Sequence, residues 1–426
     1  MEYFTIKNFR PVEAKEDSTD QDRTVLRLCE GIVPVPQGAL SSGPEWQLLW
    51  GIDDLAARAT ALLAGADVEK AHFLKLYRLD RTFVIVWSLL YNRALGFFEV
   101  QSAPGESDLD STTGVTLAAP SDPQWRDKDP GAVWYASPTA DRWILGNGID
   151  DNLQWRLGSL TVFGPATLPA DQYDLGRHRI PPCTCFRLNS NGNLFAAGNV
   201  TNPLRVWITE QPNAPFPFFT GVVSLLTSVI DIRPNGGSTR ITALSTFQNY
   251  ITVHTDRSPV NVYGANSTSD GWKCEQAASA ANASAINPAC VGDTRGDMSF
   301  YLGSDLEVYQ DQAIRSGPPD KRGARDQEIV TAQGADIWNR EMQRSLATYG
   351  YSCLYDRETR LFWIFARSVF AGRTMLWLYN ERTRACAGPI HYPDAVASTI
   401  LVGLNLSRIR RGGISGLQIG STFGVG

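Results

Sequence analysis

Residues 72–100 read HFLKLYRLDRTFVIVWSLLYNRALGFFEV, which is three apolar runs of strand length separated by two short polar breaks. The breaks contain Asp80 and Asn92, residue types that favour tight turns. The middle run, residues 83–87, is apolar at every position, as expected of a strand that is buried on both faces. The stretch therefore predicts a unit of three strands joined by tight turns.

The same kind of unit recurs along the chain. The runs that we interpret as central strands begin near residues 83, 143, 194, 250, 299 and 361. Six small sheets that are apolar on both faces can bury those faces against one another in a ring, which leaves only short edges exposed. We therefore predict an all-β fold, a β-propeller-like ring of about six blades. The alternative is a pair of β-sandwiches with irregularly spaced hairpins.

We divide the chain into three regions, which are the repeat itself and one region on each side of it. Residues 1–70 are predicted to form an extended and helical segment, residues 71–400 the propeller-like domain, and residues 401–426 a Gly-rich arm. Pro34 and Pro36 argue against a central strand in the first region. The few short helices are expected at residues 53–64 and 336–346. The arm is either a flexible tail or a segment that orders against a neighbouring subunit.

Composition narrows the class of protein. The chain is 43% hydrophobic and 19% charged, which suits a folded chain with a large core. Its formal net charge of -5 does not mark a general nucleic-acid binder. No stretch approaches the roughly 20 apolar residues of a membrane helix, so no membrane span is predicted. The first residues do not resemble a signal peptide, so we interpret the sequons at Asn199, Asn266, Asn282 and Asn405 as chance matches.

The seven cysteines show no metal-site spacing. No CxxC pair occurs, and the four histidines are scattered singly, so the second ligand pair of a zinc site is missing. Cys183 and Cys185 would share one face of a strand. We predict reduced, buried thiols in a chain that folds in a cytosol.

Motifs that carry catalysis were not found. The sequence has no P-loop, GxSxG, HExxH or EF-hand loop. The acid pairs Asp53-Asp54 and Asp150-Asp151 could be compared with glycosidase carboxylates, but we interpret them as solvated turn or cap residues. We therefore predict that the chain is not an enzyme and has no catalytic, cofactor-binding or metal-binding residue.

Three further stretches are interpreted as surface features. Residues 267–272 resemble the Asp-box turn of sialidase propellers and are predicted to be a turn. Residues 277–285, rich in small side chains, are predicted to be a surface excursion. The basic cluster Arg408, Arg410 and Arg411 is either a solvated turn or a contact to DNA phosphate or an acidic partner.

Four stretches together resemble one family. They are residues 26–40, 241–264, 296–309 and 353–380. They look like the segments of the propeller-bearing tail nozzle, or tail hub, proteins of short-tailed bacteriophages (podovirus tail proteins). The likeness covers most of residues 26–390, although no large inserted platform domain is recognisable.

The resemblance implies a structural protein of the virion tail, made in the host cytoplasm. In that family a ring of identical subunits, usually a homohexamer, extends the tail below the portal and adaptor and conducts DNA during ejection. The implied partners are other copies of the chain, the tail adaptor, tail fibre or tip proteins, and DNA that passes without sequence readout. The family has no catalytic motif to transfer. The alternatives are a carbohydrate-binding or glycoside-hydrolysing propeller, and a host-side propeller scaffold that binds proteins.

Overall fold

The computed structural model describes part of the chain, and all structural statements below refer to that part. The described residues are 32–34, 40–42, 68–79, 82–91, 94–101, 115–118, 135–138, 143–156, 159–163, 180–209, 227–233, 237–247, 250–264, 271–276, 284–293, 298–313, 325–329, 351–356, 360–367, 373–381, 385–393 and 419–424.

Six antiparallel sheets dominate the described residues. The first has five strands in the order β27-β3-β4-β5-β6, and the other five have four strands each. In every sheet, strands that follow one another in the sequence are hydrogen-bonded neighbours, except that β27 comes from the other end of the chain.

The strand bounds are as follows. The first sheet contains β27 (Ile419–Gly424), β3 (Val68–Leu79), β4 (Thr82–Tyr91), β5 (Ala94–Gln101) and β6 (Val115–Ala118). The second contains β7 (Tyr135–Pro138), β8 (Trp143–Gly146), β9 (Leu153–Arg156) and β10 (Ser159–Val162). The third contains β11 (Cys185–Leu188), β12 (Leu194–Ala197), β13 (Arg205–Thr209) and β14 (Thr227–Asp231). The fourth contains β15 (Ile241–Phe247), β16 (Tyr250–Thr255), β17 (Val260–Gly264) and β18 (Trp272–Gln276). The fifth contains β19 (Val291–Asp293), β20 (Met298–Leu302), β21 (Val308–Ala313) and β22 (Arg325–Ile329). The sixth contains β23 (Ser352–Asp356), β24 (Leu361–Arg367), β25 (Arg373–Asn380) and β26 (Ala385–Pro393).

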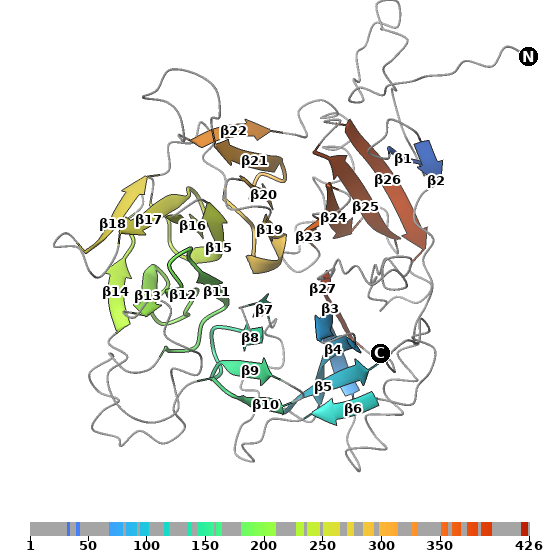
Figure 1. Cartoon of the computed structure of the whole chain (residues 1–426), viewed down its shortest axis with the longest axis horizontal. Coiled ribbons are helices and arrows are strands. Elements are labelled where there is room, and N and C mark those ends of the chain that lie inside the picture. Colours follow the sequence, from blue (N-terminus) through green and yellow to red (C-terminus); the bar gives the residue numbers. More distant parts are fainter. Residues whose placement is uncertain are drawn as a thin grey trace, which may run out of the picture.

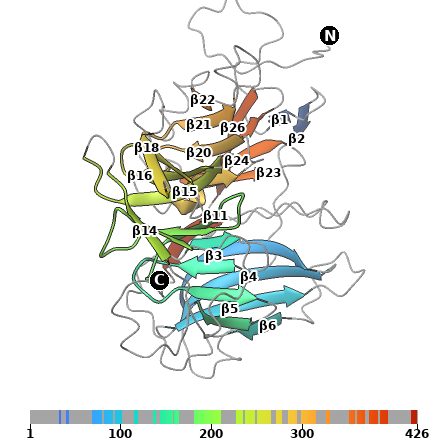
Figure 2. The ribbon, with the colours of Figure 1, turned by 60° about the vertical axis from the view of Figure 1, so that its left-hand side comes forward.

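The sheets are arranged around a common centre. Figure 1 shows β7, β11, β15, β19, β23 and β27 nearest the centre and β6, β10, β14, β18, β22 and β26 at the periphery. The innermost strands contact one another in sequence, from β7 to β11, β15, β19, β23 and β27. Figure 2 shows β3 to β6 from the side, stacked next to one another as a separate sheet. This radial order is propeller-like, and the predicted all-β fold is confirmed.

The predicted central strands are confirmed as well. The runs expected near residues 83, 143, 194, 250, 299 and 361 are β4, β8, β12, β16, β20 and β24, the strand that follows the first strand along the chain in each sheet. The reason is burial on both faces: all four residues of β12 are buried. The two-residue breaks after Leu79 and Tyr91 also fall between paired strands, in the registers Leu79↔Thr82 and Tyr91↔Ala94.

One local prediction was wrong in part. The run at residues 306–309 was expected to be the strand after β20, but that strand, β21, begins only at Val308, because Leu306 has a φ of 68° and belongs to the turn before it. β19, which precedes β20 and pairs with it, was not predicted. The peripheral strands β6, β10, β14, β18, β22 and β26 were not predicted at all.

The two ends of the chain contribute short strands. β1 (Ile32–Pro34) pairs only with β2 (Leu40–Ser42), so Pro34 lies in an edge strand, as its missing N–H requires. β27, from the predicted arm, pairs with β3 of the same chain.

Helical structure is sparse in the described ranges. The predicted helices at residues 53–64 and 336–346 lie outside the described residues. The described part contains the 3-10 helix η1 (Pro288–Cys290) and no helix with the length and apolar character needed to cross a membrane.

Candidate functional site: the contacts between neighbouring sheets

Apolar side chains fill the spaces between neighbouring sheets. Each shared cluster takes buried residues from two sheets, and burying one large apolar side chain contributes about 1.5–3 kcal/mol. Members from facing sheets include Ile144 and Phe186 in one cluster, Phe195 and Val262 in another, and Phe300 and Phe362 in a third. The rings of Phe300 and Phe362 stack with centroids 5.0 Å apart. Among the residues whose side chains the structure describes, these clusters join the second to the sixth sheet into one wall.

Hydrogen bonds tie the innermost strands to their neighbours. An innermost strand has an unpaired edge, and its buried backbone groups need partners. Side chains of adjacent sheets provide them. The bonds are Phe186 N to Ser137 Oγ (3.2 Å), Arg187 Nε to Leu244 O (3.2 Å), Thr246 Oγ1 to Leu188 O (3.4 Å) and Thr242 Oγ1 to Ala285 O (2.6 Å). The wall is therefore held by directional contacts as well as by apolar packing.

Asn152 fastens the connection between the second and third sheets. Its Nδ2 donates to the carbonyl oxygens of Pro181 (2.8 Å) and Ile180 (3.4 Å), and its Oδ1 accepts from the backbone N–H of Cys183 (2.9 Å). Asn152 is 2% exposed. An ideal Cβ at Gly146 would lie 1.9 Å from the carbonyl oxygen of Cys183, so the segment can approach only because residue 146 is glycine.

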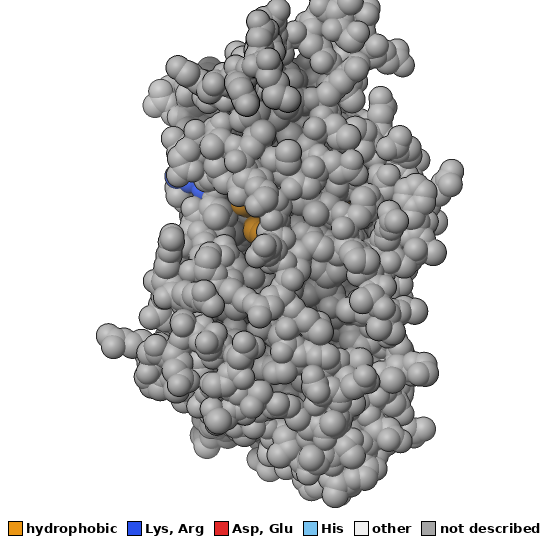
Figure 3. All heavy atoms as spheres, turned by 90° about the vertical axis from the view of Figure 1, so that its right-hand side faces the viewer, with side chains coloured by type: hydrophobic (Ala, Val, Ile, Leu, Met, Phe, Trp, Pro, Cys, Tyr) orange, Lys and Arg blue, Asp and Glu red, His pale blue; other side chains and the backbone are white. Residues whose placement is uncertain are grey.

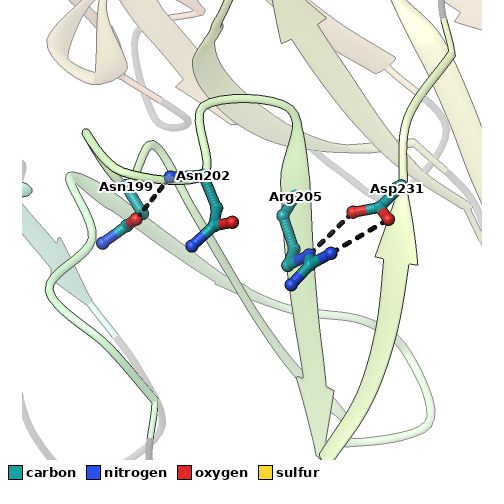
Figure 4. A network of polar contacts seen from close by, with 4 residues as sticks. All are labelled: Asn199, Asn202, Arg205 and Asp231. Atoms are coloured by element: carbon teal, nitrogen blue, oxygen red, sulfur yellow. Dashed lines mark hydrogen bonds and ion pairs between the residues drawn. The ribbon is translucent and has the colours of Figure 1, made fainter. Parts of the chain in front are cut away.

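Asn199 holds the same segment from the third sheet. Its Nδ2 donates to Pro182 O at 2.6 Å, and its Oδ1 accepts from the backbone N–H of Asn202 at 2.8 Å (Figure 4). On the solvent side of this turn, Arg205 and Asp231 form two hydrogen bonds of 2.7 and 3.0 Å. The bond from Arg205 lowers the pKa of the Asp231 carboxyl group below its usual value. Because the pair is exposed, its contribution to stability is small.

This arrangement also bears on the sequon at Asn199. The amide nitrogen that a glycan would modify donates to Pro182 O, and the Asn199 side chain is buried. In the folded chain the sequon is therefore closed to modification, in agreement with its interpretation as a chance match.

A polar side chain builds the turn after the second strand in several sheets. The side-chain oxygen accepts backbone N–H groups two or three residues further on, which is an Asx-type or ST-type turn. The acceptors and donors are Asn147 with Ile149 and Asp150, Asn199 with Asn202, Thr255 with Arg257 and Ser258, and Asp305 with Glu307. Sequence reasoning missed this repeat, although the Gly-Asn pairs at residues 146–147 and 198–199 were a visible signal.

Ser245 and His254 are the residue types of a nucleophile and its base, but their hydrogen bonds suit a structural role. His254 Nδ1 accepts from the backbone N–H of Ala285 at 3.2 Å, which places the ring proton on Nε2. Nε2 then donates to Ser245 Oγ at 2.8 Å. A serine nucleophile needs the opposite polarity, with its hydroxyl donating to the imidazole. Both residues are 0% exposed and lie in the fourth sheet, and His254 contacts the fifth sheet through Ala285 N and the ring of Tyr301.

We predicted that both acids of the pair 150–151 are solvated, and this was wrong for Asp150. Asp150 is fully buried, and its Oδ2 accepts from Asn147 Nδ2 at 2.7 Å. Asp151 is half-buried. Burial comes with a hydrogen-bonded amide partner, as a buried carboxylate requires. The other acid pair, Asp53-Asp54, lies outside the described residues.

The cysteine prediction is confirmed for four thiols. Cys183, Cys185, Cys290 and Cys353 are free and buried, whereas Cys274 is free and exposed, contrary to the prediction. Burial raises the pKa of the Cys185 thiol to about 12, although its hydrogen bond with Thr184 acts in the other direction. The side chains of Cys29 and Cys386 lie outside the described set. Among described residues, no three His, Cys, Asp or Glu side chains gather as metal ligands.

The remaining surface predictions are covered only partly. Arg408, Arg410 and Arg411 and residues 267–270 lie outside the described ranges, while Gly271, with a φ of +61°, leads into β18. Ser284 and Ala285, predicted to lie on a surface excursion, are fully buried. On the face drawn in Figure 3 the described side chains appear only as small apolar and basic spots, so they mark no docking patch there.

No protein-family model matches the sequence, and the comparison with curated proteins gives no match. Solved structures resemble the chain at low identity. A quinonprotein alcohol dehydrogenase-like protein from Bacteroides thetaiotaomicron has 8% identity and a TM-score of 0.41, over 76% of this chain and 66% of that one. A hypothetical selenium-binding protein from Sulfolobus tokodaii has 9% identity and a TM-score of 0.40, over 78% and 92%. A post-proline cleaving enzyme from Rickettsia typhi has 11% identity and a TM-score of 0.36, over 86% and 49%. These likenesses do not bear on what this chain binds or does.

Proposed function

We propose that this chain is a structural protein of a bacteriophage virion, a subunit of the tail nozzle ring that conducts DNA during ejection. In this proposal six identical subunits form the nozzle, and the six sheets described above make up the propeller-like body of each one. The proposal rests on the resemblance of residues 26–40, 241–264, 296–309 and 353–380 to tail nozzle proteins of short-tailed bacteriophages.

The observation that best supports the proposal is the set of contacts that joins the second to the sixth sheet. A nozzle wall carries mechanical load, so its blades must not slide past one another. Apolar clusters resist separation of the sheets, and directional bonds such as Arg187 Nε to Leu244 O resist sliding. A wall held by both kinds of contact suits a mechanical role.

Charge supports passage of DNA without adhesion. The chain has a formal net charge of -5, and DNA phosphates are repelled by a surface of the same sign. Six copies would multiply this charge around one axis. We expect the assembled ring to bind duplex DNA only weakly, with no dependence on base sequence.

The test is the state of the purified chain in solution and in images. We expect light scattering to give a mass near six times 46.9 kDa, about 281 kDa, and electron microscopy to show rings with an axial hole. Because a nozzle subunit can require the tail for assembly, a second measurement is needed. An antibody against this chain should label the distal tail of virions that encode it.

A monomer that leaves virions unlabelled would overturn the proposal. If that monomer hydrolysed a glycoside, or bound a glycan array with micromolar affinity, the carbohydrate-active propeller would replace it. If specific host proteins instead bound to the purified chain, the scaffold alternative would be favoured.

A further inference from the structure

Two buried cysteines face each other across the boundary between the fifth and sixth sheets. Cys290 closes η1, directly before β19, and Cys353 lies in β23. Both belong to one apolar cluster, with exposures of 0% and 3%. The two residues are far apart in the sequence, so their proximity is a product of the fold.

The two thiols are in direct contact. Cys290 Sγ donates to the carbonyl oxygen of Tyr351 at 3.4 Å, which places it beside the start of β23. Cys353 follows two positions later, and its side chain enters the same cluster as that of Tyr351. Cys290 also contributes, through a side-chain hydrogen bond, to raising the pKa of the Cys353 thiol, as expected of two neighbouring side chains in this cluster.

We propose that Cys290 and Cys353 form a reversible disulfide that staples the fifth sheet to the sixth when the protein meets hydrogen peroxide. One thiol attacks peroxide and becomes a sulfenic acid, with release of one water. The second thiol then displaces the hydroxyl group, with release of a second water. The two sulfur atoms lose two electrons and two protons in total, and peroxide takes up both.

The reaction should be slow and selective. Burial raises the pKa of the Cys353 thiol well above its ordinary value, and the neighbouring Cys290 raises it further. Because the thiolate is the nucleophile, little of it is present at neutral pH. Peroxide is small enough to reach the site during brief openings of the sheet boundary, whereas bulky oxidants are not. We therefore expect oxidation over hours.

The experiment uses the full chain in its native state. Exposed thiols, including Cys274, are first blocked with N-ethylmaleimide. The protein is then incubated with hydrogen peroxide, quenched, unfolded in iodoacetamide, digested and mapped by mass spectrometry. We expect a peptide cross-linked through Cys290 and Cys353 to accumulate, while Cys185 remains alkylatable.

The bond should also raise the melting temperature. It would close the loop from residue 290 to residue 353, and for a loop and chain of this size we expect a rise of about 4 °C. Dithiothreitol should remove both the cross-link and the rise. Cys353→Ser should show neither. The matched control is Cys185→Ser, which alters another buried thiol on a first strand and should show both.

Recovery of Cys290 and Cys353 as free thiols, after peroxide has fully oxidised a thiol-containing reference peptide added to the same sample, would overturn the proposal. So would a cross-link of either residue to a different cysteine, or a cross-link that leaves the melting temperature unchanged. If Cys353→Ser does not fold, the peptide map and melting curves of the unaltered chain decide the matter alone. None of these results depends on ring assembly, so they are separate from the proposed nozzle function.

Discussion

Replacing Asn152 with alanine should destabilise the chain strongly. The substitution removes three hydrogen bonds that join the second sheet to residues 180–183. It leaves the backbone N–H of Cys183 and the carbonyl oxygen of Ile180 buried, together with the partly buried carbonyl of Pro181. A buried polar group without a partner costs about 1–3 kcal/mol, so we expect a total loss of about 3 kcal/mol.

Urea unfolding followed by tryptophan fluorescence measures this loss. With a slope of about 3 kcal/mol per molar urea, the midpoint should fall by about 1 M. The matched control is Asn202→Ala in the neighbouring turn. The bond at Asn202 uses its backbone N–H, which alanine retains, so the change should stay within about 0.5 kcal/mol.

A conservative variant separates hydrogen bonding from packing. Asn152→Asp keeps the shape of the side chain and the acceptor for Cys183 N, but it cannot donate to Pro181 O while ionised. We expect it to be about as destabilising as alanine. The reasoning is refuted if Asn152→Ala and Asn202→Ala shift the midpoint equally.

Three shorter predictions concern other parts of the wall. Gly198→Ala should cost at least about 2 kcal/mol in urea unfolding, because residue 198 has a φ of +81° and its Cβ would lie 1.9 Å from Thr184 Oγ1; a near-neutral result would show that this turn can shift. Since the folded pKa of Cys185 is about 12 and the unfolded value is near 9, its contribution to stability is complete below pH 9 and is lost as the pH rises toward 12. Between pH 8 and 11 the free energy of unfolding should therefore fall less steeply with pH for Cys185→Ala than for the unaltered chain, by up to about 1.4 kcal/mol per pH unit. Equal slopes for the two proteins would contradict this. Removal of residues 413–426 deletes β27 and exposes the edge of β3, so we expect a lower melting temperature and self-association in size-exclusion chromatography, whereas an unchanged profile would mean that this pairing contributes little.

The parts of the fold that could be predicted are the strands whose burial is indicated by a short stretch of apolar sequence. β4 and β12 were recognisable because apolar residues at successive positions require burial on both faces of a strand. The recurrence of such runs along most of the chain, with only two short stretches of helical pattern, then made an all-β fold predictable. The number of sheets followed from counting such runs.

The peripheral strands could not be recognised in the same way. β22 reads RDQEI and β18 reads WKCEQ, which are largely polar sequences without alternation. They are strands because each completes the hydrogen bonding of an already formed neighbour, β21 and β17 respectively. A strand that forms because its neighbour needs a hydrogen-bonding partner shows little strand pattern in its own sequence.

The residues that hydrogen-bond neighbouring sheets to one another could not be predicted from the sequence for a different reason. Asn152 bonds to residues about 30 positions away, and no local pattern can show such a partner. The burial of Asp150 likewise depends on where its turn lies in the completed fold. The recurrent turn after the second strand was accessible, because a polar acceptor follows an apolar run at Asn147 and Asn199.

The first sheet has a consequence for the order of synthesis. β3 is made long before its partner β27, because the other sheets lie between them in the sequence. At about 5–20 residues per second, the edge of β3 waits tens of seconds for β27. During translation the nascent chain therefore carries an open strand edge. We expect chaperones to cover that edge, and release from them to report that the C-terminal strand has arrived.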